Sequence, residues 1–172
     1  PFLDADLVRA GVIVHDLSKI TEMLSDTLGN VSEYSTEGLL LGHLVTGVAE
    51  VRDAAKALGY PADEEYALLL EHMIISHHGV PEYGSPRKPS FPEAEVLSQL
   101  DDLDAKLNEM QTALKRTRQG EFSDRVFALD RRVYHPRYFN EEDAFSDDIA
   151  PNPAEDEGDR GFDADSAYQR LL

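Results

Sequence analysis

Six side chains with metal-binding chemistry lie on separate segments of this sequence. They are four histidines and two aspartates, namely His15, Asp16, His43, His77, His78 and Asp101. Imidazole and carboxylate ligands together suit a first-row divalent metal. An isolated His-Asp pair is weak evidence of a metal site. Six such residues on four segments predict a metal site at the place where those segments converge.

Lys19 and Asp104 are the two residues expected to act beside such a site. Lys19 follows His15 by four residues and Asp16 by three, so on a helix it shares their face. A metal would repel a lysine unless a phosphate lay between them, and the alternative is a surface salt bridge between Asp16 and Lys19. Asp101 and Asp104 share a face flanked by leucines, where two carboxylates need a cation to meet them.

Each histidine also has a structural interpretation. His43 lies on an apolar helix face, where a histidine is usually a hydrogen-bonded core residue. The pair His77–His78 ends a helix, and the helix dipole favours polar residues there. His72 points away from that pair, which favours a structural or supporting role, and His135 precedes Pro136 near the end of the globular part.

The segments that carry these residues are predicted to be helical. Hydrophobic spacing and capping residues predict helices over residues 4–24, 36–58, 63–76, 93–117 and 123–133. Asp4 or Asp6, Thr36 and Ser123 are the expected caps. The apolar run at 12–14 could alternatively be a buried strand. Residues 25–35 are a polar connector, and residues 79–92, with four prolines and two glycines, form a loop. The expected fold class is all-α.

The sequence divides into a globular part, residues 1–138, and an acidic tail, residues 139–172. The tail contains eleven acids and two bases, half of the chain's net charge of −18. We expect it to be poorly ordered, or alternatively to dock a basic partner. The chain contains no cysteine, no membrane-length apolar run and no secretory signal, which favours a cytoplasmic protein with no membrane partner. The start at Pro1 suggests a piece of a longer polypeptide.

These motifs resemble the HD-domain metal-dependent phosphohydrolases, and more closely the YhaM-type 3′-to-5′ exoribonucleases of bacteria. The resemblance covers residues 3–138 and is carried by residues 10–16, 33–43, 71–79, 81–86, 103–106 and 120–130. It implies an all-helical HD-domain bundle with a metal site between helices, so residues 12–14 would be helix.

The resemblance also implies a cofactor and a reaction. The six residues named first would hold one or two divalent transition metals, Mn as the first choice and Fe, Co, Ni or Zn as alternatives. Lys19 would lie near the scissile phosphate, and Asp104 would orient a ligand or a water. The reaction would be metal-assisted phosphodiester hydrolysis. The partner would be RNA or a nucleotide phosphate, and oligomerisation is compatible with the sequence.

Two departures from the family bear on activity. The family carries a further histidine ligand before the His-Asp motif and an OB-fold domain that binds nucleic acid, and this chain begins after both. We therefore expect a weak nuclease. Bases at residues 87–88 and between residues 115 and 137 could guide RNA locally. One alternative is a nucleotide or cyclic-dinucleotide phosphohydrolase. The other is a non-catalytic HD-type interaction module.

Overall fold

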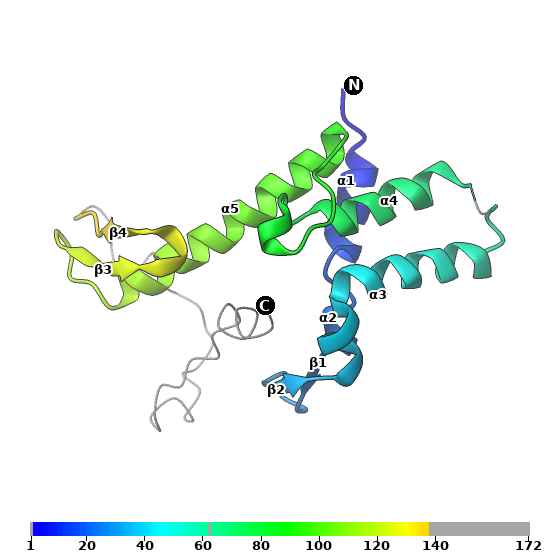
Figure 1. Cartoon of the computed structure of the whole chain (residues 1–172). Helices are drawn as coiled ribbons and strands as arrows, with labels where there is room; N and C mark the ends of the chain where they lie inside the picture. Colours follow the sequence, from blue (N-terminus) through cyan, green and yellow to red (C-terminus); the bar gives the residue numbers. More distant parts are fainter. Residues whose placement is uncertain (1, 62, 138–172) are drawn as a thin grey trace.

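The computed structural model describes residues 2–61 and 63–137, and these form a mostly helical chain with two short hairpins (Figure 1). The all-α expectation is confirmed. The acidic tail and the boundary at residue 138 lie outside the described residues. No described helix is both long enough and apolar enough to cross a membrane.

The first predicted helix is shorter than expected. Helix α1 spans Ala5–Val14, and the Asp4 side chain caps it by accepting the amides of Asp6 and Leu7. Residues 12–14 are therefore helix. The chain then turns through residues 15–18 before the short helix α2, Lys19–Glu22. The prediction of one helix to residue 24 is wrong because buried Ser18 donates to Glu50 of a later helix at 2.6 Å, a contact that local spacing does not contain.

The polar connector after α2 folds as a hairpin. Strand β1, Met23–Ser25, pairs antiparallel with β2, Val31–Tyr34. The Asp26 side chain closes the turn by accepting the amides of Leu28 and Asn30. This use of aspartate is a common turn device, so the connector is more ordered than its composition suggested.

Helix α3, Thr36–Ala57, is kinked, and its cap lies one residue earlier than predicted. Ser35, not Thr36, caps it by accepting the Gly38 amide at 3.0 Å. Gly42 has φ 70° and ψ 162° inside the helix, a conformation that favours glycine. At Gly38 a Cβ would lie 2.4 Å from the Glu22 carbonyl oxygen, so this glycine permits the close approach of α2.

Two further helices complete the scaffold of the site. Helix α4, Glu65–Ser76, lies beside α3, and the loop after it contains a 3-10 turn, η1, over Pro81–Tyr83 (Figure 1). Helix α5, Pro92–Lys115, has proline in its first turn as predicted. Helices α1, α4 and α5 meet at a small core made of Leu7, Met73, Ala94 and Leu97.

The predicted fifth helix is wrong, because residues 123–133 belong to a second hairpin. Strand β3, Phe122–Val126, leads through the 3-10 turn η2, Phe127–Leu129, into β4, Arg131–Tyr134. Ser123 was interpreted as a helix cap, but its buried hydroxyl accepts the Val133 amide across the hairpin at 2.9 Å. Asp130, with φ 51°, closes the turn. The hairpin packs at the C-terminal end of α5 (Figure 1).

Candidate metal centre

The turn after α1 places His15 and Asp16. The ring atom His15 Nδ1 lies 2.9 Å from the Val12 carbonyl oxygen. On the other side of the ring, Nε2 lies 3.4 Å from Asp16 Oδ2 and 3.7 Å from Asp101 Oδ1 of α5. Adjacent residues on a regular helix would diverge, so the turn allows both to face one centre.

The kink in α3 places His43. Its backbone amide donates to Glu22 Oε1 at 3.1 Å, and its Nδ1 lies 3.1 Å from Glu22 Oε2. The backbone amide and the ring nitrogen Nδ1 of His43 are thus both held by one buried glutamate from α2. The remaining ring nitrogen, Nε2, lies 3.4 Å from Asp16 Oδ1.

The end of α4 places the pair His77–His78. Fully buried His77 has Nδ1 2.7 Å from the Ile74 carbonyl oxygen and Nε2 3.6 Å from Asp16 Oδ1. His78 Nδ1 lies 2.7 Å from the Tyr83 carbonyl oxygen, and Ser85 accepts the His78 amide. The loop after α4 therefore orients the second histidine. The two ring centroids are 4.1 Å apart.

All four histidines direct the same nitrogen at an oxygen acceptor. Each Nδ1 faces a backbone carbonyl or the Glu22 carboxylate. A carbonyl or carboxylate oxygen only accepts, so the proton lies on Nδ1 and the lone pair on Nε2. Metal-binding histidines are oriented in the same manner. Four rings in one tautomer present four ligand atoms.

Buried polar atoms without partners lie at the middle of the cluster. Among the described residues, Asp16 Oδ1, His43 Nε2 and His77 Nε2 are buried and make no hydrogen bond. Leaving such atoms unpaired costs about 1–3 kcal/mol each, so a native structure needs a reason for them. Ligand atoms of two overlapping groups lie within 4.8 Å of one another, namely His43, His77 and His78, and His15, Asp16 and His77. The donor set and the unpaired atoms fit a divalent metal.

The surroundings of several of these groups hold them in the protonation state that metal binding requires. Burial acts to raise the pKa of Asp16, but the neighbouring His77 and the Lys19 cation outweigh it and lower that pKa well below its usual range. The neighbouring His15 lowers the pKa of Asp101. Burial and the neighbouring His77 lower the pKa of His78 to about 4. At neutral pH both carboxylates are ionised and His78 is neutral.

The two residues expected beside the metals differ in position. Lys19 Nζ lies 2.8 Å from Asp16 Oδ2, at the edge of the cluster. The salt bridge that was its alternative interpretation is therefore formed. Asp104 is exposed on α5, and no contact joins it to the cluster among the described residues. Its role in orienting a ligand stays a prediction.

Sequence reasoning missed Glu22. This buried glutamate is 21 positions before the histidine whose ring and amide it holds, and no spacing rule connects the two. The other two histidines lie outside the cluster, as expected. His72 Nε2 accepts the Ser90 amide, and His135 Nδ1 contacts the Thr117 carbonyl oxygen.

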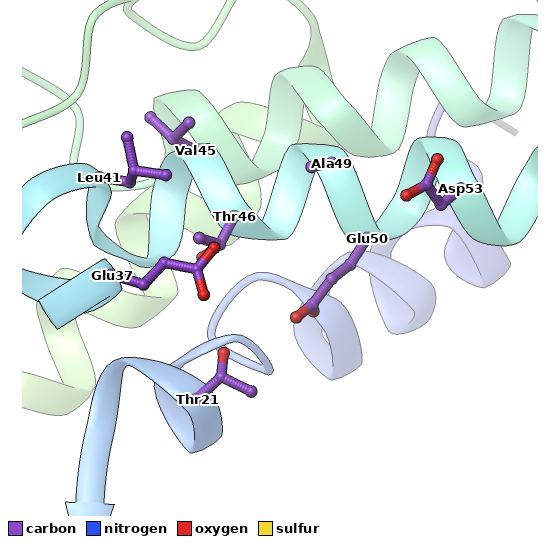
Figure 2. Close-up of a pocket in the computed structure, with 8 residues that line it drawn as sticks. All are labelled: Thr21, Glu37, Leu41, Val45, Thr46, Ala49, Glu50 and Asp53. Carbon is purple, nitrogen blue, oxygen red and sulfur yellow. The ribbon is translucent and has the colours of Figure 1, made fainter. Parts of the chain in front are cut away.

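A pocket of about 210 Å³ lies on α3, with Thr21 of α2 at its rim (Figure 2). Its other lining residues are Glu37, Leu41, Val45, Thr46, Ala49, Glu50 and Asp53. None of the six predicted metal ligands lines it, so the pocket is separate from the metal centre.

The HD domain family matches residues 2–106, a span that contains all six predicted metal ligands. This chain belongs to the HD-domain family. The β3–β4 hairpin lies beyond the matched span.

Two curated relatives of this HD domain are named 3′-5′ exoribonuclease YhaM. The protein of Bacillus licheniformis is 49% identical over 141 residues, covering 81% of this chain and 43% of the relative. The protein of Bacillus subtilis is 48% identical over 141 residues, with the same coverage. The chain thus spans less than half the length of these relatives. No solved structure matches it.

Proposed function

We propose that this HD domain is the catalytic domain of a metal-dependent phosphodiester hydrolase that acts as a 3′-to-5′ exoribonuclease. The observation that carries the proposal is the set of buried, unpaired atoms of Asp16, His43 and His77 facing one centre. The names of the two relatives supply the substrate class and the direction of degradation.

Six residues would hold the cofactor: His15, Asp16, His43, His77, His78 and Asp101. One or two divalent ions, Mn as the first choice, would supply Lewis-acid activation of water and charge neutralisation at phosphoryl oxygens. Two overlapping ligand groups that share His77 support either number of ions. Fe, Co, Ni and Zn suit the same mixed imidazole and carboxylate ligands.

The chain itself contributes positioning and charge. Glu22 and three backbone carbonyls keep the four imidazoles turned so that Nε2 faces the centre. Lys19 would leave its bridge to Asp16 for a phosphoryl oxygen, where its charge stabilises the negative charge of the transition state. Asp104 would orient a water from the next turn of α5.

The proposal extends to location and further domains. The relatives are more than twice as long as their matched parts, which leaves room for a separate RNA-binding domain such as the expected OB-fold. A cytoplasmic location and oligomerisation stay predictions.

The test is degradation of a single-stranded RNA that carries a 5′ label, with Mn²⁺ added after chelation. A ladder that shortens from the 3′ end, with release of nucleoside 5′-monophosphates, is expected. Asp16→Asn is the inactive control, and Asp6→Asn, an exposed aspartate on α1, is its matched counterpart. Turnover of mononucleotides or cyclic dinucleotides without any RNA degradation would contradict the proposal and favour a small-molecule phosphohydrolase. Absence of both metal and turnover would favour a non-catalytic module.

A further inference from the structure

The last described segment, residues 115–137, is basic in an otherwise acidic chain. We call it the hairpin end; it comprises the C-terminus of α5 and the β3–β4 hairpin. It contains seven lysines and arginines against three acids, whereas residues 1–114 contain seven against twenty. A polyanion is therefore attracted to the hairpin end and repelled by most of the remaining surface.

Three arginines of the hairpin end are available to an incoming anion. Arg116, Arg118 and Arg131 are exposed and form no ion pair with any described acid. Arg125, by contrast, is paired with Asp130, and Arg132 donates to the Ser123 carbonyl oxygen at 2.7 Å. Two arginines thus stabilise the hairpin, and Arg116, Arg118 and Arg131 leave their charge on the surface of the hairpin end.

Exposed aromatic rings accompany these charges. Phe127, at the tip of the hairpin, is 89% exposed, and Phe122 is 56% exposed. The rings of Phe122 and Tyr134 face each other across the strands at 5.1 Å, with the Arg132 guanidinium 5.7 Å from the Phe122 centroid. Aromatic rings interleaved with arginines form the surface on which bases of a single strand stack.

We propose that the hairpin end binds single-stranded RNA, as a second contact apart from the metal centre. The proposal rests on the proposed function for the identity of the polyanion. Arginines would contact phosphates without regard to sequence, and Phe127 would stack on a base. An acidic protein would use the same arginines but would have no specific need for the exposed ring at the tip.

The geometry of α5 predicts how long the RNA must be. Asp101 lies in the metal centre, and α5 ends at Lys115, which corresponds to about 20 Å of helix at 1.5 Å per residue. A stacked strand carries one phosphate per roughly 3.4 Å, so about six nucleotides connect the two ends. Oligonucleotides shorter than this would reach the metal centre without contacting the hairpin end.

Charge variants test the proposal in metal-free binding. The double variant Arg118→Gln with Arg131→Gln is compared with Arg9→Gln with Lys56→Gln, which removes the same charge from exposed positions on α1 and α3. Fluorescence anisotropy with a labelled RNA of roughly 12 nucleotides in chelator measures affinity against salt. The hairpin variant should lower the slope of log affinity against log salt by about 1.4, or ~0.7 per lost phosphate contact, and the control should change it little.

The stacking role of the Phe127 ring is tested separately. Phe127→Ala should weaken binding of the same RNA by about fivefold or more, while Phe2→Ala, which removes another exposed phenylalanine, should leave it unchanged. Circular dichroism reports whether each variant stays folded. A Phe127→Trp variant, which keeps a stacking surface, should retain affinity, whereas loss of affinity in Phe127→Trp as well would contradict stacking.

The outcomes separate this proposal from the proposed function, because binding is measured without metal and needs no turnover. Equal losses of affinity in the hairpin and control charge variants would overturn the RNA contact, even if the chain degrades RNA. Specific loss of binding in the hairpin variants would support the contact, even if no RNA is degraded. In an active chain, hydrolysis of roughly four-nucleotide RNA should be the same in wild type and Arg118→Gln/Arg131→Gln, and an equal defect on short and long RNA would overturn the proposed spacing.

Discussion

The two halves of α5 lie in regions of opposite character. Near its N-terminal half, Asp101 joins a half-buried cluster of imidazoles and carboxylates whose ligand atoms face one centre. At its C-terminal end, arginines and aromatic rings are directed to solvent on a hairpin. One region concentrates polar atoms that need a partner ion, and the other displays charge to a large polyanion.

The contrast shows how differently the two surfaces depend on the fold. The candidate metal centre draws its predicted ligands from four segments, so it forms only when the turn after α1, helix α3, the end of α4 and helix α5 pack together. The hairpin end is continuous in sequence and is held by contacts within its own segment, such as that between Ser123 and Val133 across the two strands. A substitution that disrupts one region should therefore leave the other intact, and the last two predictions below test that independence.

Loss of the central ligands should have the largest effect. Changing His15 and Asp16 to alanine removes two members of one ligand group, including the carboxylate that faces Nε2 of both His43 and His77, so bound transition metal should fall to background. Elemental analysis after metal repletion and dialysis measures this. His72→Gln, a histidine outside the cluster, should keep full metal content. Unchanged stoichiometry in the double variant would refute the site.

Removal of Lys19 should have the next largest effect and should separate phosphate binding from metal binding. Because Lys19 contacts Asp16 through its cation and is not a ligand, Lys19→Ala should retain metal. Its turnover of RNA should fall by about 10²–10³-fold, as expected for loss of one preorganised charge. Lys106→Ala, an exposed lysine paired with Asp102, is the control. Loss of metal with a near-normal rate per bound ion would contradict this role.

Changing Glu22 should have an intermediate effect on metal affinity and no effect on RNA binding. Glu22→Gln weakens the contact that holds His43 Nδ1, and loss of such supporting contacts lowers metal affinity by about 10–100-fold. Competition with a fluorescent chelator gives the Kd. Glu33→Gln, an exposed glutamate of β2, should leave the Kd unchanged. RNA binding in chelator should be the same for both variants, and a defect there would show that the two regions are coupled.

The smallest expected effect lies in the hairpin. Ser123→Ala leaves the Val133 amide without its buried acceptor, which should destabilise the hairpin by about 1–3 kcal/mol. Hydrogen exchange should report faster opening of residues 122–134, with metal content unchanged. Ser32→Ala removes an exposed hydroxyl contact in the other hairpin and should cost within about 0.5 kcal/mol. Loss of metal on Ser123→Ala would refute the independence of the two ends.

Local chemistry in the sequence was enough to predict most of the scaffold and all six candidate ligands. Helical periodicity, the proline at the start of α5 and the glycines and prolines after α4 are short-range signals, and they predicted α3, α4, α5 and the intervening loop closely. The ligand types and their placement on separate segments predicted a convergent site, and the structure brings His15, Asp16, His43, His77, His78 and Asp101 together. The family resemblance that these motifs carried is confirmed.

Only the tertiary structure decided the turn at residues 15–18, the kink at Gly42, the role of Glu22 and the second hairpin. The turn depends on the contact of Ser18 with Glu50, and the kink and the role of Glu22 depend on the contact of Glu22 with His43. The hairpin depends on Ser123 accepting the Val133 amide of the opposite strand. Helix propensity differs by less than about 1 kcal/mol between most residue types, so one buried hydrogen bond of this kind is enough to override the local preference. The sequence alone thus determined which side chains could bind a metal, and packing determined how they are held in place.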